Sequence, residues 1–171
     1  VKAMGEEVRE KGYTALKTNT FNYDENGKPT GYRPGFGTPF EPGLNIERKQ
    51  LRDLRTHLEA MRDGAGPDVD ILLDLNFNMK TEGYLKILRE IADLDMFWIE
   101  IDSYNPAALA YIRDHSPHPI SSCETLLGLR EFLPYFQAQS MDVAIIDAVW
   151  NGVWQSMKIA ASAEAQEINV A

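Results

Sequence analysis

One pattern occurs three times in this sequence: a short apolar run that ends on a carboxylate. Residues 71–73 lead into Asp74, residues 96–99 into Glu100, and residues 119–123 into Glu124. The three acids are 26 and 24 residues apart, which is about the length of one strand and one helix. This period predicts parallel strands that present carboxylates at one edge of a sheet, where the catalytic groups of a βα barrel collect.

Three converging carboxylates repel one another unless a cation lies between them. Ligation by oxygen atoms alone suits Mg²⁺, so a magnesium site is one interpretation of the pattern. A second interpretation is that each acid caps the helix that follows its strand, because carboxylates accept hydrogen bonds from the first N–H groups of a helix. The spacing alone leaves both interpretations open.

Strand and helix patterns alternate along the whole chain, which indicates a parallel sheet. The acids at the strand ends favour a barrel over an open sheet. We therefore predict the α/β class, with a single, incomplete TIM-type (β/α) barrel domain over residues 1–171 that contains six of the eight strands.

A complete barrel needs at least about 200 residues. We expect this chain to be part of a longer polypeptide or to be completed by another chain. The predicted strands are 13–19, 69–74, 96–100, 119–123, 143–146 and 168–171, and the predicted helices are 1–11, 46–63, 81–93, 105–114, 126–136 and 151–166.

Residues 20–45 differ in composition from the rest of the chain. They are rich in glycine, proline and asparagine, with aromatic residues interspersed. A structureless loop of this length inside a compact domain is usually functional, which predicts a lid or a binding loop. The aromatic residues favour a loop that packs against the rest of the protein, and a disordered insertion is the alternative.

The charge balance limits the partners of the protein. The net charge is −9, with 26 acidic and 17 basic residues, so we expect neither nucleic acid nor a membrane as a partner. No apolar run approaches the ~18 residues of a membrane helix. We expect a cytoplasmic protein, and we expect it to form a homo-oligomer. The single cysteine, Cys123, excludes an intramolecular disulfide and is expected to be buried and unreactive.

Polar residues that can take part in chemistry stand at the ends of successive predicted strands. Because side chains alternate along a strand, Lys17 and Asn19 lie on one face of theirs, and the same holds for Asp74 with Asn76 and for Glu100 with Asp102. We expect all of these side chains to point into the mouth of the barrel. The full set is Lys17, Asn19, Asp74, Asn76, Glu100, Asp102, Glu124 and Asp147.

Five motifs in this order resemble the barrel domain of the enolase superfamily, in the mandelate racemase/muconate-lactonizing group. They are Ala15–Asn19, Asp74–Asn76, Trp98–Glu100, Ser122–Thr125 and Ile146–Asp147. No single motif is specific, but the five together are, and the resemblance covers the chain from about residue 5.

The resemblance implies a Mg²⁺ ion held by Asp74, Glu100 and Glu124. The resemblance implies that this ion binds the carboxylate of a small substrate, which is a hydroxy acid or an acid sugar. A base then removes the α-proton to give a metal-stabilised enediolate. Three carboxylates on one dication leave a net negative charge, and Lys17 is the lysine placed to offset it. Asn76 and Asp102 are candidates for contacts with the substrate or with water, and structural hydrogen bonding is an equal alternative for both.

The sequence departs from the family pattern in its proton-transfer groups. The family commonly has Lys-x-Lys on the first of these strands, but the second position here is Asn19, which cannot act as a base. Lys17 is therefore expected to clamp the substrate carboxylate. Asp147 matches the aspartate of the family's His–Asp dyad, and the histidine is expected just beyond residue 171.

The three histidines of the chain do not replace that group. We expect His57 on the exterior of a helix, and His115 and His118 in a solvated loop at the opposite end of the barrel. One-base chemistry favours dehydration of an acid sugar. The alternatives are a racemase, epimerase or cycloisomerase of the same superfamily, or a catalytically silent barrel fragment. We expect these 171 residues alone to turn over little or no substrate.

Overall fold

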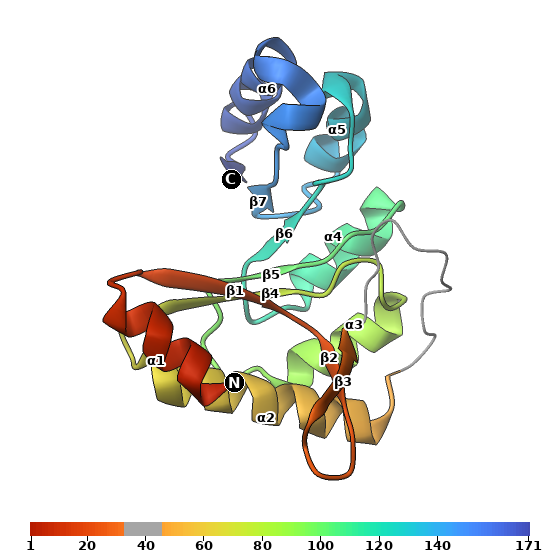
Figure 1. Cartoon of the computed structure of the whole chain (residues 1–171). Helices are drawn as coiled ribbons and strands as arrows, with labels where there is room; N and C mark the ends of the chain where they lie inside the picture. The colour runs from red at the N-terminus through yellow and green to blue at the C-terminus, as the bar shows by residue number, and fades with distance from the viewer. Residues whose placement is uncertain (33–45) are drawn as a thin grey trace.

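The computed structural model describes residues 1–32 and 46–171. Its main sheet has six parallel strands that are hydrogen-bonded to one another in chain order (Figure 1). This order confirms the predicted fold class, a partial barrel of parallel strands alternating with helices. The strands are β1 (Ala15–Asn19), β4 (Asp70–Asp74), β5 (Trp98–Glu100), β6 (Ile120–Ser122), β7 (Val143–Ala144) and β8 (Asn169–Val170).

One helix connects each pair of successive strands in the sheet. Figure 1 shows these helices following one another in chain order, from α2 at the bottom to α6 at the top. No helix among residues 1–32 and 46–171 is both long enough and apolar enough to cross a bilayer. The connecting helices are α2 (Arg48–Ala65), α3 (Thr81–Glu90), α4 (Pro106–Asp114), α5 (Gly128–Gln137) and α6 (Ala148–Glu164), and α1 (Lys2–Glu10) precedes β1.

Local sequence explains where several helices begin. Asn105 caps α4 by accepting hydrogen bonds from the N–H groups of Ala107 and Ala108, and Pro106 occupies the first turn, where a missing N–H costs nothing. Glu47 and Gln50 form a reciprocal capping box at the start of α2. These caps fix the direction in which each helix leaves the preceding loop.

The apolar core lies between the sheet and its helices. Leu73, Ile99 and Ile120 contribute fully buried side chains from three neighbouring strands, and Phe132 and Phe136 contribute two more from α5. Burying side chains of this size stabilises the fold by about 1.5–3 kcal/mol each. The core therefore holds the strands in register and the site residues at their ends.

Helices α1 and α2 approach each other closely through two glycines. A Cβ atom on Gly5 would lie 2.5 Å from the carbonyl oxygen of Met61 and 2.6 Å from the backbone nitrogen of Ala65. A Cβ atom on Gly64 would meet the carbonyl oxygen of Lys2. The absence of a side chain at both positions lets the two backbones come into contact.

The segment predicted as a structureless loop contains a β-hairpin. Strands β2 (Phe21–Tyr23) and β3 (Pro29–Tyr32) pair antiparallel. Asp24 stabilises the turn between them, because its Oδ1 atom accepts hydrogen bonds from the backbone N–H groups of Asn26 and Lys28. The prediction of a loop over residues 20–45 is therefore wrong for the hairpin, and residues 33–45 lie outside the described residues.

Candidate active site

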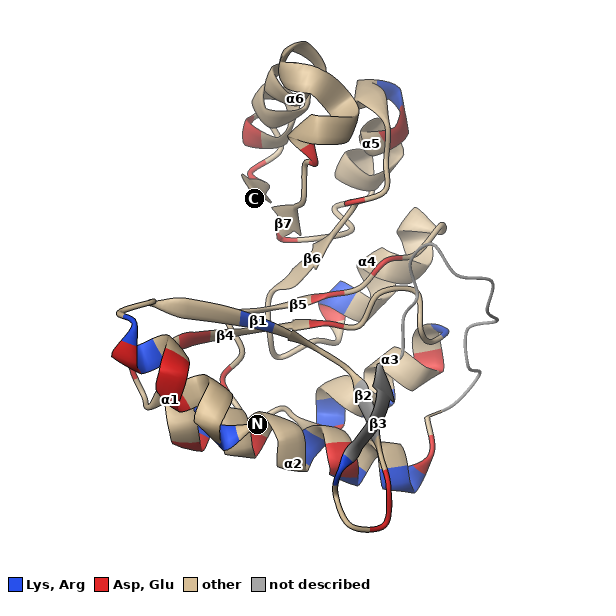
Figure 2. Cartoon of the chain, viewed as in Figure 1, with Lys and Arg blue, Asp and Glu red and all other residues tan. Residues whose placement is uncertain are grey.

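The strand register brings the predicted site residues into one row. Asn19 of β1 pairs with Asp74 of β4, and Asp74 pairs with Glu100 of β5. Each of the three is the last residue of its strand. Figure 2 shows acidic segments of β4 and β5 beside a basic segment of β1. The C-terminal edge of the sheet therefore brings these three residues side by side, and their roles in a site stay predictions.

Lys17 joins two of the carboxylates. Its Nζ atom lies 3.1 Å from Oδ2 of Asp74 and donates a hydrogen bond to Oε2 of Glu100. Burial alone would lower the pKa of Lys17, but the hydrogen bond and charge of Glu100, together with the charge of Asp74, raise the pKa above its ordinary value. These interactions favour the protonated form of Lys17, and its role as a clamp stays a prediction.

A second acidic group lies beside this ion pair. One oxygen atom from each of Glu100, Asp102 and Glu124 lies within 4.8 Å of the other two. Glu100 is fully buried and Asp102 is 6% exposed. The Oε1 atom of Glu100 is buried without a hydrogen-bond partner in residues 1–32 and 46–171. An all-oxygen donor set with an unsatisfied buried carboxylate oxygen fits a hard cation such as Mg²⁺.

The negative charges of these carboxylates repel one another. Burial and the neighbouring charge of Asp74 raise the pKa of Glu100 to about 8, although the interaction with Lys17 acts in the opposite direction. Burial and the charges of Asp74 and Glu124 raise the pKa of Asp102 to about 7. The site therefore has more buried negative charge than Lys17 alone can compensate.

The backbone turns sharply where β6 leads into Glu124. Cys123 has a φ of 83°, which is unusual for a residue with a side chain. Its backbone N–H donates to Oδ1 of Asp102, and the Ser122 hydroxyl donates to the same atom, both at 3.3 Å. The turn that carries Glu124 is thus attached to Asp102. Cys123 itself is buried, as predicted.

Asn76 supports Asp74. Its backbone N–H donates to Oδ1 of Asp74 at 2.9 Å, and its side-chain amide donates to the same oxygen. The hydroxyl of Tyr84 donates to the carbonyl oxygen of Asn76 at 2.6 Å. Asn76 thus has a structural role in these contacts, and its contact with substrate stays a prediction.

Asp147 follows β7 and caps the next helix. Its Oδ1 atom accepts hydrogen bonds from the N–H groups of Val149 and Trp150 at the start of α6. Asp147 is therefore the N-cap of α6. Its role in orienting a catalytic histidine stays a prediction.

Two histidines are more buried than the sequence suggested. His57 is 5% exposed and lies between the hydroxyls of Thr18 and Tyr23, so its predicted exterior position is wrong. His118 is 7% exposed and contacts the carbonyl oxygen of Ile91 at 3.0 Å, so it does not belong to a solvated loop. His115 is exposed, as predicted.

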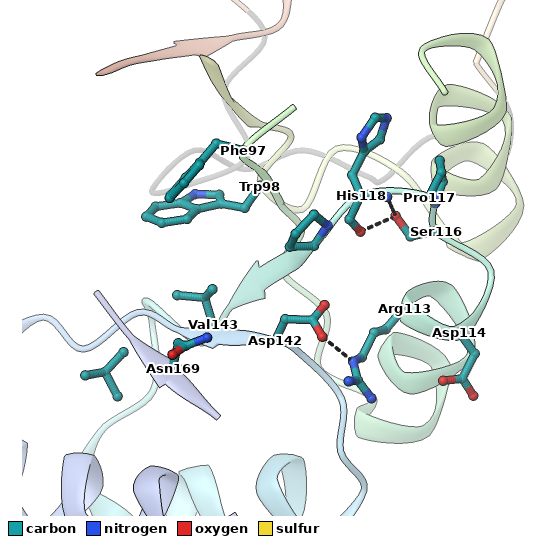
Figure 3. A pocket seen from close by; sticks show the side chains of 12 residues that line it. Phe97, Trp98, Arg113, Asp114, Ser116, Pro117, His118, Asp142, Val143 and Asn169 are labelled. Carbon is teal, nitrogen blue, oxygen red and sulfur yellow. Dashed lines mark hydrogen bonds and ion pairs between the residues drawn. The ribbon is translucent and has the colours of Figure 1, made fainter. Parts of the chain in front are cut away.

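A hollow of about 890 Å³ lies at the opposite end of the sheet from the acids. Figure 3 shows Phe97 and Trp98 facing it on one side, with Val143 and Asn169 on the other. Phe97 precedes β5 and Trp98 is its first residue, whereas Glu100 is its last. This hollow is therefore distinct from the edge that carries the carboxylates.

Asp102 lies in the acidic group with Glu100 and Glu124. The alternation of side chains along a strand had placed Glu100 and Asp102 on the same face. The predicted contact of Asp102 with substrate stays a prediction, and so does the predicted role of Asp74, which lies beside Lys17, as a metal ligand.

Comparison with known proteins identifies the family. A family model described as "Enolase C-terminal domain-like" matches residues 1–171. The chain belongs to this family. Its sequence resemblance to the mandelate racemase/muconate-lactonizing group of the enolase superfamily is thereby confirmed.

Three relatives illustrate the range of the family. A proposed L-alanine-DL-glutamate epimerase of Burkholderia xenovorans strain LB400, solved with magnesium and fumarate, is 66% identical, with a TM-score of 0.92 over 99% of this chain. The D-gluconate dehydratase of Thermoproteus tenax is 30% identical over 77% of this chain. A D-galactonate dehydratase family member of Oceanicola granulosus (strain ATCC BAA-861 / DSM 15982 / KCTC 12143 / HTCC2516) is 26% identical over 84% of it. The chain spans 42%, 27% and 38% of these three proteins, respectively.

Proposed function

We propose that this chain forms the metal-binding part of a Mg²⁺-dependent enzyme that removes the α-proton of an acid sugar and eliminates its β-hydroxyl group. The observation that carries the proposal is the buried Oε1 atom of Glu100, which lacks a hydrogen-bond partner among the described residues although Glu100 belongs to a group of three carboxylates. A buried oxygen of this kind needs a cation or a donor.

Three carboxylates at the strand ends would hold the ion: Asp74, Glu100 and Glu124. When bound, Mg²⁺ would polarise the substrate carboxylate and so acidify the neighbouring C–H bond. The three acids follow successive strands of one rigid parallel sheet. Their positions are therefore fixed before the substrate arrives, which reduces the cost of reorganisation during the reaction.

Lys17 would bind the substrate carboxylate. Its ammonium group already lies among carboxylates and is half-buried, so it can bind another anionic oxygen at little entropic cost. The carboxylates of Glu100 and Asp74 raise the pKa of Lys17 and favour its charged form, so we assign the α-proton to another group. Asn19, at the end of the same strand, would donate a hydrogen bond to the substrate.

Proton abstraction requires a base that the three histidines do not supply. His57 is enclosed by Thr18 and Tyr23, and His118 lines the hollow at the opposite end of the sheet. We assign the base to a histidine outside these 171 residues that Asp147 orients. The α-C–H bond breaks and the proton passes to this base, which would return a proton to the β-hydroxyl as the C–O bond breaks and water leaves. The enol that remains takes a proton from solvent at C3 and so becomes the 2-keto-3-deoxy acid.

Epimerisation is the second candidate function. The supporting observation is the 66% identity to a proposed epimerase. Epimerisation needs a proton donor on the second face of the substrate, where the family commonly has a lysine and this chain has Asn19. That difference favours elimination, and so do the two dehydratase relatives.

The test is to express the full-length gene product that contains this sequence and to assay it with Mg²⁺ on D-gluconate and D-galactonate. We expect a 2-keto-3-deoxy product from an acid sugar, and we expect Glu100→Gln to abolish it. Product formation that persists in Glu100→Gln would refute the metal assignment. Formation of the epimer alone would favour the second candidate.

A further inference from the structure

We propose that the outer face of helix α6 is the surface through which two copies of the full-length protein form a dimer. This face carries four exposed apolar side chains within nine residues of the chain, and we call them the α6 patch: Val149, Val153, Trp154 and Met157. The patch is separate from the acidic group at the strand ends. The proposal therefore does not depend on the proposed function.

The centre of the α6 patch faces away from the sheet. Gly152, which has a φ of 68°, divides α6 into a first turn and a longer helical segment. In the longer segment, Ile159 and Ala163 are fully buried and hold the helix against the core. Because a helix has 3.6 residues per turn, Trp154 and Met157 project from roughly the opposite side. Their side chains are 73% and 64% exposed, respectively.

More strands and helices in the same barrel would not cover this face. The helices of a βα barrel form a ring around the strands, so each helix packs inward on the sheet and sideways on its neighbours in the ring. Helix α6 packs sideways on α5 (Figure 1). Its outer face can be covered only by another domain or by another molecule.

The size of the α6 patch fits a dimer interface. From their exposed fractions, the four residues expose roughly 550 Å², which is near the upper end of the about 300–600 Å² found for the largest apolar patch of a typical monomer. A pairing of two copies would bury roughly 1,100 Å² of this surface, and a specific interface needs at least about 1,000 Å². The polar rim of the interface would add to this area.

The distribution of charge favours a second copy as the partner. The chain has a net charge of −9, so two copies repel each other over much of their surfaces. Only two of the 17 residues of α6 are charged, whereas eight of the 18 residues of α2 are, and Figure 2 shows this contrast. The α6 patch is thus a place where two acidic molecules can meet with little repulsion.

The one basic residue of α6 lies beside the patch. Nζ of Lys158 is 5.0 Å from the centroid of the Trp154 ring. Its positive charge would face a partner that is acidic as a whole, which is favourable at the rim of an interface.

Two-fold symmetry lets the patch pair with itself. In a two-fold dimer both copies contribute the same surface, so an apolar face meets an identical apolar face. Tryptophan and methionine are enriched at interfaces, and tryptophan is among the residues that contribute most to binding. We therefore place Trp154 and Met157 close to the two-fold axis.

The test compares the mass of the full-length protein in solution, measured by light scattering during size-exclusion chromatography, in the wild type and in Met157→Glu. The glutamate is exposed in a folded monomer, whereas a dimer would bury its charge in both copies. We expect the wild type to be a dimer or an assembly of dimers, and we expect Met157→Glu to have half the wild-type mass or less.

Met4→Glu is the matched control. It makes the same substitution at a methionine of α1 that is 57% exposed, and it should keep the wild-type mass. Trp154→Ala is a second variant, which removes the largest side chain of the patch without adding a charge. Alanine is the best helix former, so this variant should fold even if Met157→Glu does not. Its dimer dissociation constant, measured by analytical ultracentrifugation, should rise at least about tenfold.

Each outcome decides the proposal. Weaker association of either α6 variant, with Met4→Glu unchanged, supports the α6 patch as the dimer interface. A monomeric wild type would overturn the proposal, and so would equal loss of mass in Met4→Glu. Unchanged association of both α6 variants would overturn it as well. If these variants then also unfold at a lower temperature, another domain of the same polypeptide covers α6.

Discussion

The Nζ atom of Lys17 lies 3.1 Å from Oδ2 of Asp74, across the boundary between two neighbouring strands. The same ammonium group contacts Glu100 on the next strand. A single lysine on an edge strand thus links three successive strands of the sheet. Lys17 therefore neutralises part of the negative charge that these strands bring together.

Replacing Lys17 by glutamine should reduce activity strongly. The variant loses the positive charge that we assign to the substrate carboxylate, and removal of a preorganised electrostatic contact costs about 10²–10³-fold in kcat. Steady-state kinetics of the full-length protein measures this effect. Lys49→Gln is the control, because Lys49 pairs with Asp53 on the surface of α2. Equal activity in the two variants would rule out the clamp.

Asp147 is expected to show separate effects on stability and on activity. Asp147→Ala loses both hydrogen bonds to the start of α6, which should lower the free energy of unfolding by about 1 kcal/mol. Asp147→Asn keeps the cap and should be nearly as stable as the wild type in thermal unfolding, yet it should have a much lower kcat. Full activity in Asp147→Asn would mean that Asp147 only caps the helix.

Gly5→Ala should weaken the packing of α1 on α2. The new Cβ atom would lie 2.5 Å from the carbonyl oxygen of Met61, and overpacking of this kind costs about 1–3 kcal/mol. Chemical denaturation measures the loss. Gly83→Ala is the control, because the atoms nearest to the Cβ atom there would belong to the flexible side chain of Met79. A loss at Gly83 that equals or exceeds the loss at Gly5 would contradict the account.

The buried position of His57 predicts that the stability of the folded protein depends on pH. Burial lowers the pKa of His57 to about 4 in the folded protein, whereas an unfolded chain has a pKa near the ordinary value of 6.5. Between these values the unfolded state binds more protons, so the stability contribution present above pH 6.5 is lost as the pH falls toward 4.

The pH effect is measured as the difference in free energy of unfolding between the wild type and His57→Gln across pH 4–7. The wild type should lose stability relative to the variant on acidification, by at most about 1.4 kcal/mol per pH unit. A constant difference across this range would show that His57 does not titrate as its burial requires.

Much of the fold could be predicted because it depends on local patterns. Apolar runs of three to five residues, which alternate with amphipathic helices at intervals of about 25 residues, predict a parallel sheet. Each of these strands ends where an apolar run meets a carboxylate, and this pattern predicts that Asp74 and Glu100 lie at the same edge of the sheet. In the structure Asp74 of β4 pairs with Glu100 of β5.

The parts that could not be predicted depend on tertiary contacts. The burial of His57 comes from the β2–β3 hairpin and from Thr18, residues that lie 34 and 39 positions away in the chain. The hairpin itself has the turn-rich composition of a loop. The grouping of Asp102 with Glu124 depends on the turn at Cys123, whose positive φ no local pattern indicates.

The most direct test of the central claim is proton NMR of an acid sugar incubated in D₂O with Mg²⁺ and the full-length protein. Dehydration and epimerisation both begin with removal of the α-proton, so we expect a Mg²⁺-dependent loss of the α-proton signal that Glu100→Gln abolishes. We also expect a 2-keto-3-deoxy acid that carries solvent deuterium at C3. An α-proton signal that persists with every acid sugar, or that is lost equally in Glu100→Gln, would contradict the proposed function.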